Sequence, residues 1–128
     1  MTRPQVLVVD DEQLIRTMVR DALEDVPCDI REASSGDAAL KMVNDAPPSV
    51  VLLDLLMPGK SGLEVLGLIS SKCHVLVMSA LDTEALVQQA LAGGAHGYLS
   101  KPIHPLDVQN LVRAALEDAA RRKAGAAS

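Results

Sequence analysis

The chain has 128 residues, of which 48% are hydrophobic and 23% are charged, and its formal net charge is -5. This length and composition favour one globular domain with a hydrophobic core. The sequence contains no Trp, no Phe and one Tyr, which argues against the aromatic stacking surfaces that bind single-stranded nucleic acids. The negative charge argues against binding to a phosphate backbone, so we expect no direct nucleic-acid binding.

The sequence shows no signal for a membrane or for an oxidising compartment. No apolar run approaches the roughly 20 residues that cross a bilayer, and residues 1–5 lack the features of a secretory signal. The two cysteines, Cys28 and Cys73, are too few for a disulfide framework and lack the spacing of metal ligands. We therefore expect buried free thiols and a cytoplasmic protein.

Short apolar runs alternate with helical patterns along the chain. In chain order, the first half of the sequence predicts a strand at residues 6–9, a helix at 14–23, a strand at 29–33 and a helix from Ser35 to the Pro47-Pro48 pair. The second half predicts a strand at 50–53, a helix at 63–70, a strand at 75–78, a helix from Thr83 to the Gly93-Gly94 pair, a strand at 97–100 and a helix after Pro105. Strands one, three and four are wholly apolar, which is typical of strands buried on both faces of a parallel sheet.

Five strands that alternate with five helices predict an α/β fold in which helices cover both faces of a parallel sheet. The apolar strands belong at its centre, and the flavodoxin-like, doubly wound order 2-1-3-4-5 places them there. We expect residues 1–122 to form this domain and residues 123–128 to be a flexible tail or linker.

Polar residues follow four of the predicted strands. Strand one is followed by Asp10 and Asp11, strand three by Asp54, strand four by Ser79 and strand five by Lys101. The carboxyl ends of parallel strands share one edge of the sheet, and such an edge binds ligands where the winding direction reverses. Each of these residues alone could be a turn former, a helix cap or a solvated charge. Their joint occurrence favours a functional site.

Three carboxylates at this edge require a compensating positive charge. At about 4 Å, each pair of like charges costs roughly 4 kcal/mol near a protein surface. Lys101 supplies one positive charge, and a divalent cation would supply two more. Oxygen ligands without nearby His or Cys suit a hard ion, so we predict Mg²⁺.

A carboxylate beside such a cation can accept a phosphoryl group as an acyl phosphate. The reaction needs in-line positioning and charge stabilisation around the phosphoryl oxygens, which Lys101, the Ser79 hydroxyl and the metal would provide. Three alternatives compete with this hypothesis. A phosphohydrolase would place a second Asp two residues after Asp54, where the chain has Leu56. A flavodoxin would need a Ser/Thr-rich loop in place of Asp10 and its acidic neighbours. An inert interaction module would not require these side chains.

The sequence resembles a response-regulator receiver domain of two-component signalling over roughly residues 5–118. The motifs that carry the resemblance are Val8-Val9-Asp10-Asp11-Glu12, Asp54-Leu55-Leu56-Met57-Pro58-Gly59 with Gly62, Ser79-Ala80, and Gly94-Ala95-His96-Gly97-Tyr98-Leu99-Ser100-Lys101-Pro102. Small departures are Ser79 in place of the commoner Thr and Ile103 where Phe is frequent.

The resemblance implies a specific role for each of these residues. It makes Asp54 the phosphoacceptor and assigns Mg²⁺ to Asp11, Asp54 and the backbone carbonyl of Leu56, with Asp10 acting through water. It also places Ser79 and Lys101 at the phosphoryl group and suggests a cis peptide bond before Pro102.

The resemblance further implies a switch rather than an enzyme. Tyr98 would turn inward when Ser79 moves toward the phosphoryl group, and the surface of the fourth helix, fifth strand and fifth helix would then change. The phosphoryl donor would be a sensor histidine kinase or a histidine phosphotransfer protein. The output would pass to an effector protein or to a further domain, and a homodimer is compatible with this function.

Two apolar residues lead to a sharper hypothesis about the lifetime of the acyl phosphate. Leu56 and Leu81 lie two residues after Asp54 and Ser79, where their side chains would flank the path of water to the phosphoryl group. Neither side chain can orient a hydrolytic water, so we predict slow loss of the phosphoryl group. Alternatively, the two leucines merely cover loop surface.

Overall fold

The computed structural model describes residues 3–81 and 83–127, with side chains through residue 122. Its elements are β1 (Gln5–Val9), α1 (Gln13–Ala22), β2 (Asp29–Ala33), α2 (Gly36–Asp45), β3 (Val50–Asp54), α3 (Gly62–Ile69), β4 (His74–Ser79), α4 (Glu84–Ala92), β5 (Gly97–Ser100) and α5 (Pro105–Ala127). All five strands and all five helices were predicted from the sequence, and most predicted bounds agree within two residues.

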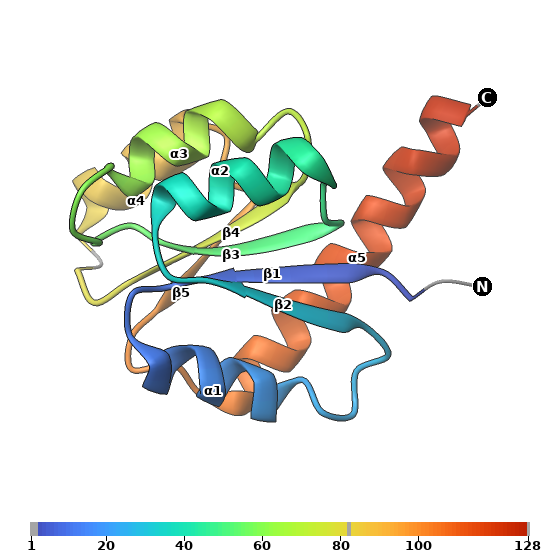
Figure 1. Cartoon of the computed structure of the whole chain (residues 1–128), viewed down its shortest axis with the longest axis horizontal. Coiled ribbons are helices and arrows are strands. Elements are labelled where there is room, and N and C mark those ends of the chain that lie inside the picture. Colours follow the sequence, from blue (N-terminus) through green and yellow to red (C-terminus); the bar gives the residue numbers. More distant parts are fainter. Residues whose placement is uncertain (1–2, 82, 128) are drawn as a thin grey trace.

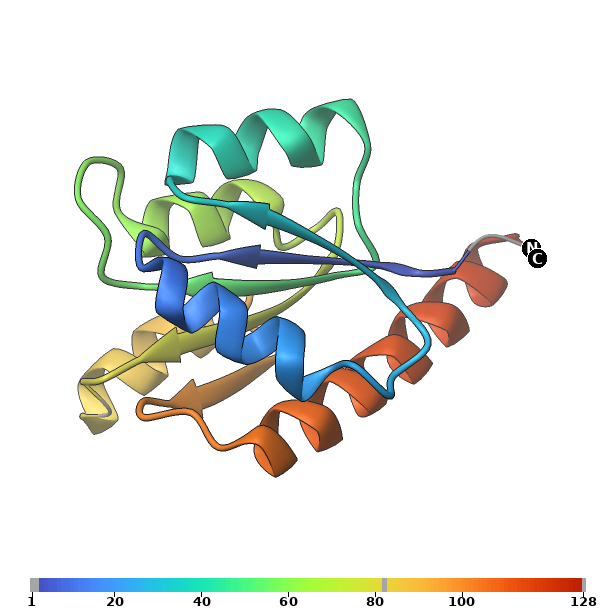
Figure 2. The same ribbon diagram turned by 60° about the horizontal axis from the view of Figure 1, so that its bottom comes forward.

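The strands form one parallel sheet in the order β2-β1-β3-β4-β5, which confirms the predicted topology. The helices lie in two layers, with α1 and α5 on one face and α2, α3 and α4 on the other (Figure 1). The strand arrows all point toward the same edge of the sheet, which Figure 2 shows from a second direction. The functional side chains predicted from the sequence lie at this carboxyl edge.

Each central strand contributes to two hydrophobic cores. In β1, Val6 and Val8 pack with α1 and α5, whereas Leu7 and Val9 pack with the opposite layer of helices. All four side chains are fully buried. Burial of a side chain of this kind stabilises the fold by about 1.5–3 kcal/mol, so a continuous apolar run is favourable only in a strand that is covered on both faces.

The cysteines are buried free thiols, as predicted. Cys28 precedes β2 and Cys73 precedes β4, so each lies at the entrance to a strand. Burial raises the pKa of the Cys73 thiol to about 11. The thiolate is therefore scarce near neutral pH, and Cys73 acts as a small apolar side chain.

The last helix differs from the sequence prediction. We expected a flexible tail from residue 123, but α5 continues as a helix through Ala127 and extends beyond the body of the domain (Figures 1 and 2). Five of the nine residues from 119 to 127 are Ala, the residue with the highest helix propensity, which outweighs the cost of Gly125. Whether residue 122 marks a domain boundary stays a prediction.

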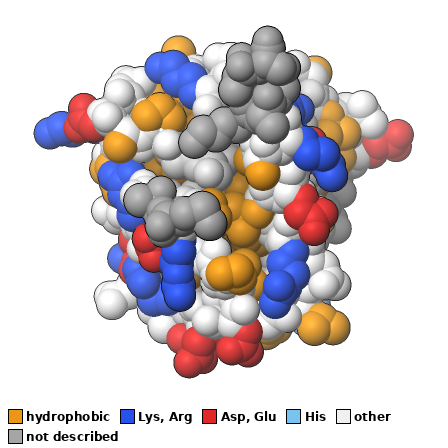
Figure 3. All heavy atoms as spheres, turned by 90° about the vertical axis from the view of Figure 1, so that its right-hand side faces the viewer, with side chains coloured by type: hydrophobic (Ala, Val, Ile, Leu, Met, Phe, Trp, Pro, Cys, Tyr) orange, Lys and Arg blue, Asp and Glu red, His pale blue; other side chains and the backbone are white. Residues whose placement is uncertain are grey.

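The face at the amino ends of the strands differs chemically from the carboxyl edge. Apolar side chains gather on this face in Figure 3, with both basic and acidic side chains around them. A hollow of about 550 Å³ is lined there by Val26, Pro27 and Leu116, among others.

Among the described residues, no helix is long and apolar enough to cross a membrane.

Candidate metal and phosphoacceptor site

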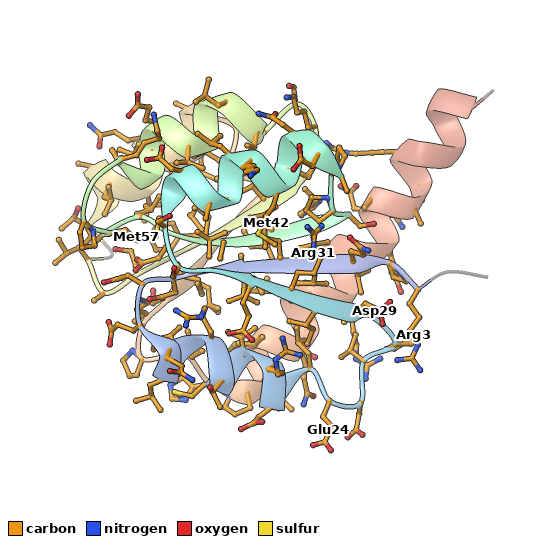
Figure 4. All side chains as sticks on the ribbon, viewed as in Figure 1. Arg3, Glu24, Asp29, Arg31, Met42 and Met57 are labelled. Atoms are coloured by element: carbon orange, nitrogen blue, oxygen red, sulfur yellow. The ribbon has the colours of Figure 1, made fainter. Side chains whose placement is uncertain are left out.

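The carboxyl edge of the sheet brings the predicted site residues together. Asp54 is the last residue of β3 and pairs with Met78, one residue before Ser79. The backbone N–H of Lys101 donates to the Ser79 carbonyl at 2.9 Å, which holds the end of β5 beside β4. Met57, labelled in Figure 4, lies in the loop that leaves this edge, whereas Arg3 and Asp29 lie at the opposite end of the sheet.

Asp10 is a fully buried carboxylate with defined partners. Its Oδ1 accepts the backbone N–H of Glu12 at 2.9 Å, and its Oδ2 accepts from Lys101 Nζ at 2.9 Å. Its own N–H donates to the Ala33 carbonyl at 3.1 Å, which continues the pairing of β1 with β2. A buried carboxylate needs such partners to remain charged.

Asp54 is 2% exposed and shares the same ammonium group. Its Oδ1 accepts the Leu56 N–H at 3.1 Å, and its Oδ2 lies 3.3 Å from Lys101 Nζ. Burial and the nearby charge of Asp10 raise the pKa of Asp54, although the Leu56 N–H and Lys101 act in the opposite direction. The charged form of Asp54 is therefore not fully compensated by the protein alone.

Lys101 remains an ammonium in this environment. Burial alone would lower the pKa of Lys101, but the hydrogen bond that Lys101 donates to Asp10 and the charges of Asp54 and Asp10 outweigh it and raise the pKa. The peptide bond between Lys101 and Pro102 is cis, as the family resemblance predicted.

The described residues include one cluster that fits a hard cation. Asp10, Asp11 and Asp54 each offer a carboxylate oxygen, and these three oxygens lie within 4.8 Å of one another. Asp11 is exposed, so the cluster is open to solvent on one side. Three carboxylates and one ammonium leave two negative charges, and oxygen ligands of this kind suit Mg²⁺.

Ser79 and Tyr98 are connected through the backbone of Leu81. The Ser79 hydroxyl, which is fully buried, accepts the Leu81 N–H at 3.0 Å. The Tyr98 hydroxyl donates to the Leu81 carbonyl at 2.6 Å. The half-buried Tyr98 side chain therefore contacts the same loop that Ser79 holds.

One polar contact at this edge was not predicted. Arg16 Nη1 of α1 donates to the Asp10 carbonyl at 2.7 Å. Arg16 and Arg20 are four residues apart on one helix face, and both contact Glu32 of β2. This spacing could have indicated an ion-pair network, but it gives no indication that Arg16 reaches the backbone of Asp10.

Comparisons with known proteins point to one protein family. The family model of the response regulator receiver domain matches residues 6–113. The chain is 30% identical over 111 residues to the chemotaxis protein CheY of Halobacterium salinarum, which covers 84% of this chain and 92% of that protein. It is 37% identical over 119 residues to the transcriptional regulatory protein ResD of Bacillus subtilis, covering 91% of this chain and 50% of ResD.

Solved structures show the same similarity. The signal receiver domain of a putative Luxo repressor protein from Vibrio parahaemolyticus superposes with a TM-score of 0.90 at 27% identity, over 94% of this chain and 95% of that one. The receiver domain of a putative response regulator NarL from Mycobacterium tuberculosis has a TM-score of 0.84 and is 34% identical, over 91% of this chain and 98% of that one. The chain thus matches nearly the whole of CheY but only half the length of ResD.

Proposed function

We propose that this chain, which belongs to the response regulator receiver domain family, accepts a phosphoryl group on Asp54 in a Mg²⁺-dependent reaction. Receiver domains are signalling domains rather than classical enzymes. The phosphoacceptor, the metal ligands and the switch residue are our assignments for this sequence.

The observation that carries the proposal is the arrangement of charge around Asp54. One oxygen of the buried Asp54 carboxylate accepts the Leu56 N–H, and the other lies near Lys101 Nζ. The carboxylates of Asp10 and Asp11 lie close to it. Raising the pKa of Asp54 keeps its oxygen more basic and more nucleophilic than that of a solvated carboxylate. An Asp at a surface turn could also accept the N–H two residues on, but it would lack the burial, the Lys101 ammonium and the neighbouring carboxylates.

The transfer step follows from this arrangement. An Asp54 oxygen attacks the phosphorus of a phosphohistidine in line with the leaving nitrogen. A P–O bond forms as the P–N bond breaks, and its electron pair returns to the imidazole of the donor. Lys101 can then move from the Asp54 oxygen to a phosphoryl oxygen, and the Ser79 hydroxyl can donate to another.

Asp10, Asp11 and Asp54 would hold Mg²⁺, together with the backbone carbonyl of Leu56. The bound ion would offset the charge of the carboxylates and of the phosphoryl oxygens. Asp10 is itself bonded to Lys101, so we assign it a water-mediated contact. Asp11 is the exposed member of the cluster and the one most accessible to an ion from solvent.

The proposed switch uses the connection through Leu81. When the Ser79 hydroxyl turns toward the phosphoryl group, its bond with the Leu81 N–H is lost. The loop can then shift, and the Tyr98 hydroxyl loses its acceptor and turns inward. The surface of α4, β5 and α5 would carry this change to an effector or to an output domain.

The proposed partners follow from the family. The donor is a sensor histidine kinase or a histidine phosphotransfer protein, and a homodimer is one form in which the switched surface could act. ResD and NarL, both about twice as long as the matched region, are named as a transcriptional regulatory protein and a nitrate/nitrite response regulator.

Incubation with acetyl phosphate and Mg²⁺, followed by intact mass spectrometry, tests the proposal. We expect a phosphoryl adduct on the wild type that is absent from Asp54→Asn and is strongly reduced when EDTA replaces Mg²⁺. A wild type without adduct would support the inert interaction module. An adduct that persists in Asp54→Asn would assign the phosphoacceptor to another residue.

A further inference from the structure

The polar contacts below the acidic cluster converge on Arg16, whose side chain is 15% exposed. Its guanidinium donates from Nη1 to the Asp10 carbonyl at 2.7 Å and from Nε to Glu32 Oε1 at 3.0 Å. A planar guanidinium with two fixed partners has little freedom to move. Arg16 thus fixes the Asp10 carbonyl relative to α1 and to the edge strand β2.

The Asp10 carbonyl belongs to the peptide plane that leads into Asp11. Because this plane is rigid, the direction of the carbonyl determines where the backbone of Asp11 lies. The side-chain bond from Glu12 N–H to Asp10 Oδ1 fixes the next part of the turn. Ala33 and Lys101 hold the N–H and the carboxylate of Asp10, whereas Arg16 holds the carbonyl from which the turn continues to Asp11.

We propose that Arg16 is a positioning residue for the metal site. By holding the Asp10 carbonyl, it directs the Asp11 carboxylate toward the oxygens of Asp10 and Asp54. The inference rests on the proposed function, because it takes these carboxylates as the Mg²⁺ site. It adds a residue that contacts neither the ion nor the phosphoryl group.

The positive charge of Arg16 should affect Mg²⁺ affinity in the direction opposite to its positioning contact, which makes the proposal testable. A cation near the cluster repels Mg²⁺, so removal of its charge alone would strengthen metal binding. Loss of the positioning contact would weaken metal binding instead. The direction of the change therefore separates positioning from a simple charge effect.

Arg20 provides a matched control on the same helix. It donates to Glu32 Oε2 at 2.8 Å from Nη2 and to the Ile30 carbonyl at 3.3 Å. Arg20→Gln removes one positive charge and an ion pair with Glu32, as Arg16→Gln does, but leaves the bond between Arg16 and Asp10 intact. Glu32→Gln removes both ion pairs and also retains that bond.

The experiment is a Mg²⁺ titration of the unphosphorylated full chain, followed by backbone amide NMR shifts. Loss of an interaction that orients metal ligands typically weakens binding by about tenfold or more, so we expect the Kd of Arg16→Gln to rise by about this factor. Arg20→Gln and Glu32→Gln should remain close to wild type. Arg16→Lys should bind with intermediate affinity, because its ammonium can still donate to the Asp10 carbonyl.

An unchanged or lower Kd for Mg²⁺ in Arg16→Gln would overturn the proposal. An equal rise of the Kd in Arg20→Gln would overturn it too. The same spectra show whether each variant is folded, and Arg16→Lys replaces Arg16→Gln if the latter unfolds. A wild type with neither Mg²⁺ binding nor a phosphoryl adduct would overturn the proposed function and this inference with it. A wild type with both, beside an Arg16→Gln variant of equal affinity, would overturn the role of Arg16 alone.

Discussion

Lys101 is the side chain that contacts both buried carboxylates of the site. Its ammonium lies 2.9 Å from Asp10 Oδ2 and 3.3 Å from Asp54 Oδ2, so it partly neutralises two buried carboxylates at once. One positive charge cannot balance both of them and Asp11 as well. The remaining negative charge would attract a dication, and it would also disfavour an approaching phosphoryl group if no cation were bound.

The lifetime of the proposed acyl phosphate would depend on the side chains that flank it. Leu56 is 53% exposed and Leu81 is 54% exposed, so both present apolar groups to solvent beside the site. We expect Leu56→Asn to lose the phosphoryl group severalfold faster than wild type, because an amide can hold a water near the phosphorus. The decay of the adduct after removal of acetyl phosphate, measured by intact mass, gives the rate.

Leu68→Asn is the matched control for this substitution. Leu68 is 52% exposed on α3, so the change in surface polarity is the same without a water-binding group two residues after Asp54. Its decay rate should equal that of wild type. Equal rates for Leu56→Asn and wild type would show that Leu56 only covers loop surface.

The sequence predicted the ionic site residues because each follows a strand. Asp10, Asp54 and Lys101 could be placed at one edge as soon as the strands were known to be parallel. The role of Arg16 could not be predicted in this way. It depends on the rotation of α1 about its own axis and on its height above β2, which tertiary packing determines and a helical period does not.

At the level of the elements, α3 approaches the loop after β3 more closely than a side chain would allow. A Cβ on Gly62 would lie 2.5 Å from Leu55 Cα and 2.6 Å from the Asp54 carbonyl oxygen. Both atoms belong to the backbone and cannot turn away. Gly62 therefore allows the amino end of α3 to lie against the end of β3 at Asp54 and the start of the loop that follows it.

Gly62→Ala should destabilise the protein by roughly 1–3 kcal/mol, because overpacking must displace either the helix or the loop. Urea unfolding followed by circular dichroism measures the change. Phosphorylation by acetyl phosphate should also become slower, since the displaced backbone is that of Asp54 and Leu55. Unchanged stability in Gly62→Ala would show that the contact relaxes without cost.

Gly67 of the same helix is the control. Apart from its chain neighbours and the backbone of its own helix, a Cβ at Gly67 would meet no atom within 4 Å, so Gly67→Ala adds a methyl group to an exposed helix position. We expect it to stabilise the protein by about 0.5–1 kcal/mol, because Ala has a higher helix propensity than Gly. Opposite signs for the two substitutions would assign the effect of Gly62 to the close approach.

For the molecule as a whole, the fold was predictable because both cores depend on strand residues that alternate between two layers. The all-apolar strands could be placed at the centre and the more polar β2 and β5 at the edges, and the known flavodoxin-like order then gave the arrangement of the three central strands. The length of α5 was not predictable, because the same Ala-rich and Gly-containing composition is also found in flexible linkers. The part of α5 that precedes this extension brings Asp118 and Arg122 to the amino end of the sheet, opposite the acidic site.

That end of the molecule holds a cluster of charged and titratable side chains from three elements. His96, just before β5, stacks on His74 of β4 with ring centroids 4.3 Å apart. Asp118 Oδ2 of α5 lies 2.9 Å from His74 Nδ1 and 3.1 Å from Arg122 Nε. His96 Nδ1 accepts the Val75 N–H at 3.0 Å, and Arg122 Nη1 lies 2.9 Å from His96 Nε2.

The packing of α5 against β4 and β5 should therefore weaken in mild acid. Burial, with the nearby His74 and Arg122, lowers the pKa of His96 below its ordinary value of 6.5, although Asp118 acts in the opposite direction. The unfolded chain then binds this proton more readily than the folded protein, so stability is present above pH 6.5 and is lost as the pH falls toward the pKa of the folded state. Urea unfolding at pH 7.5, 6.5 and 5.5 should show this loss in wild type and in His104→Gln, which alters an exposed histidine. In His96→Gln the loss should be smaller, because a proton on His96 would face the Val75 N–H and the Arg122 guanidinium, and Gln cannot take up that proton. A loss in His96→Gln as large as in wild type would assign the pH dependence to other groups.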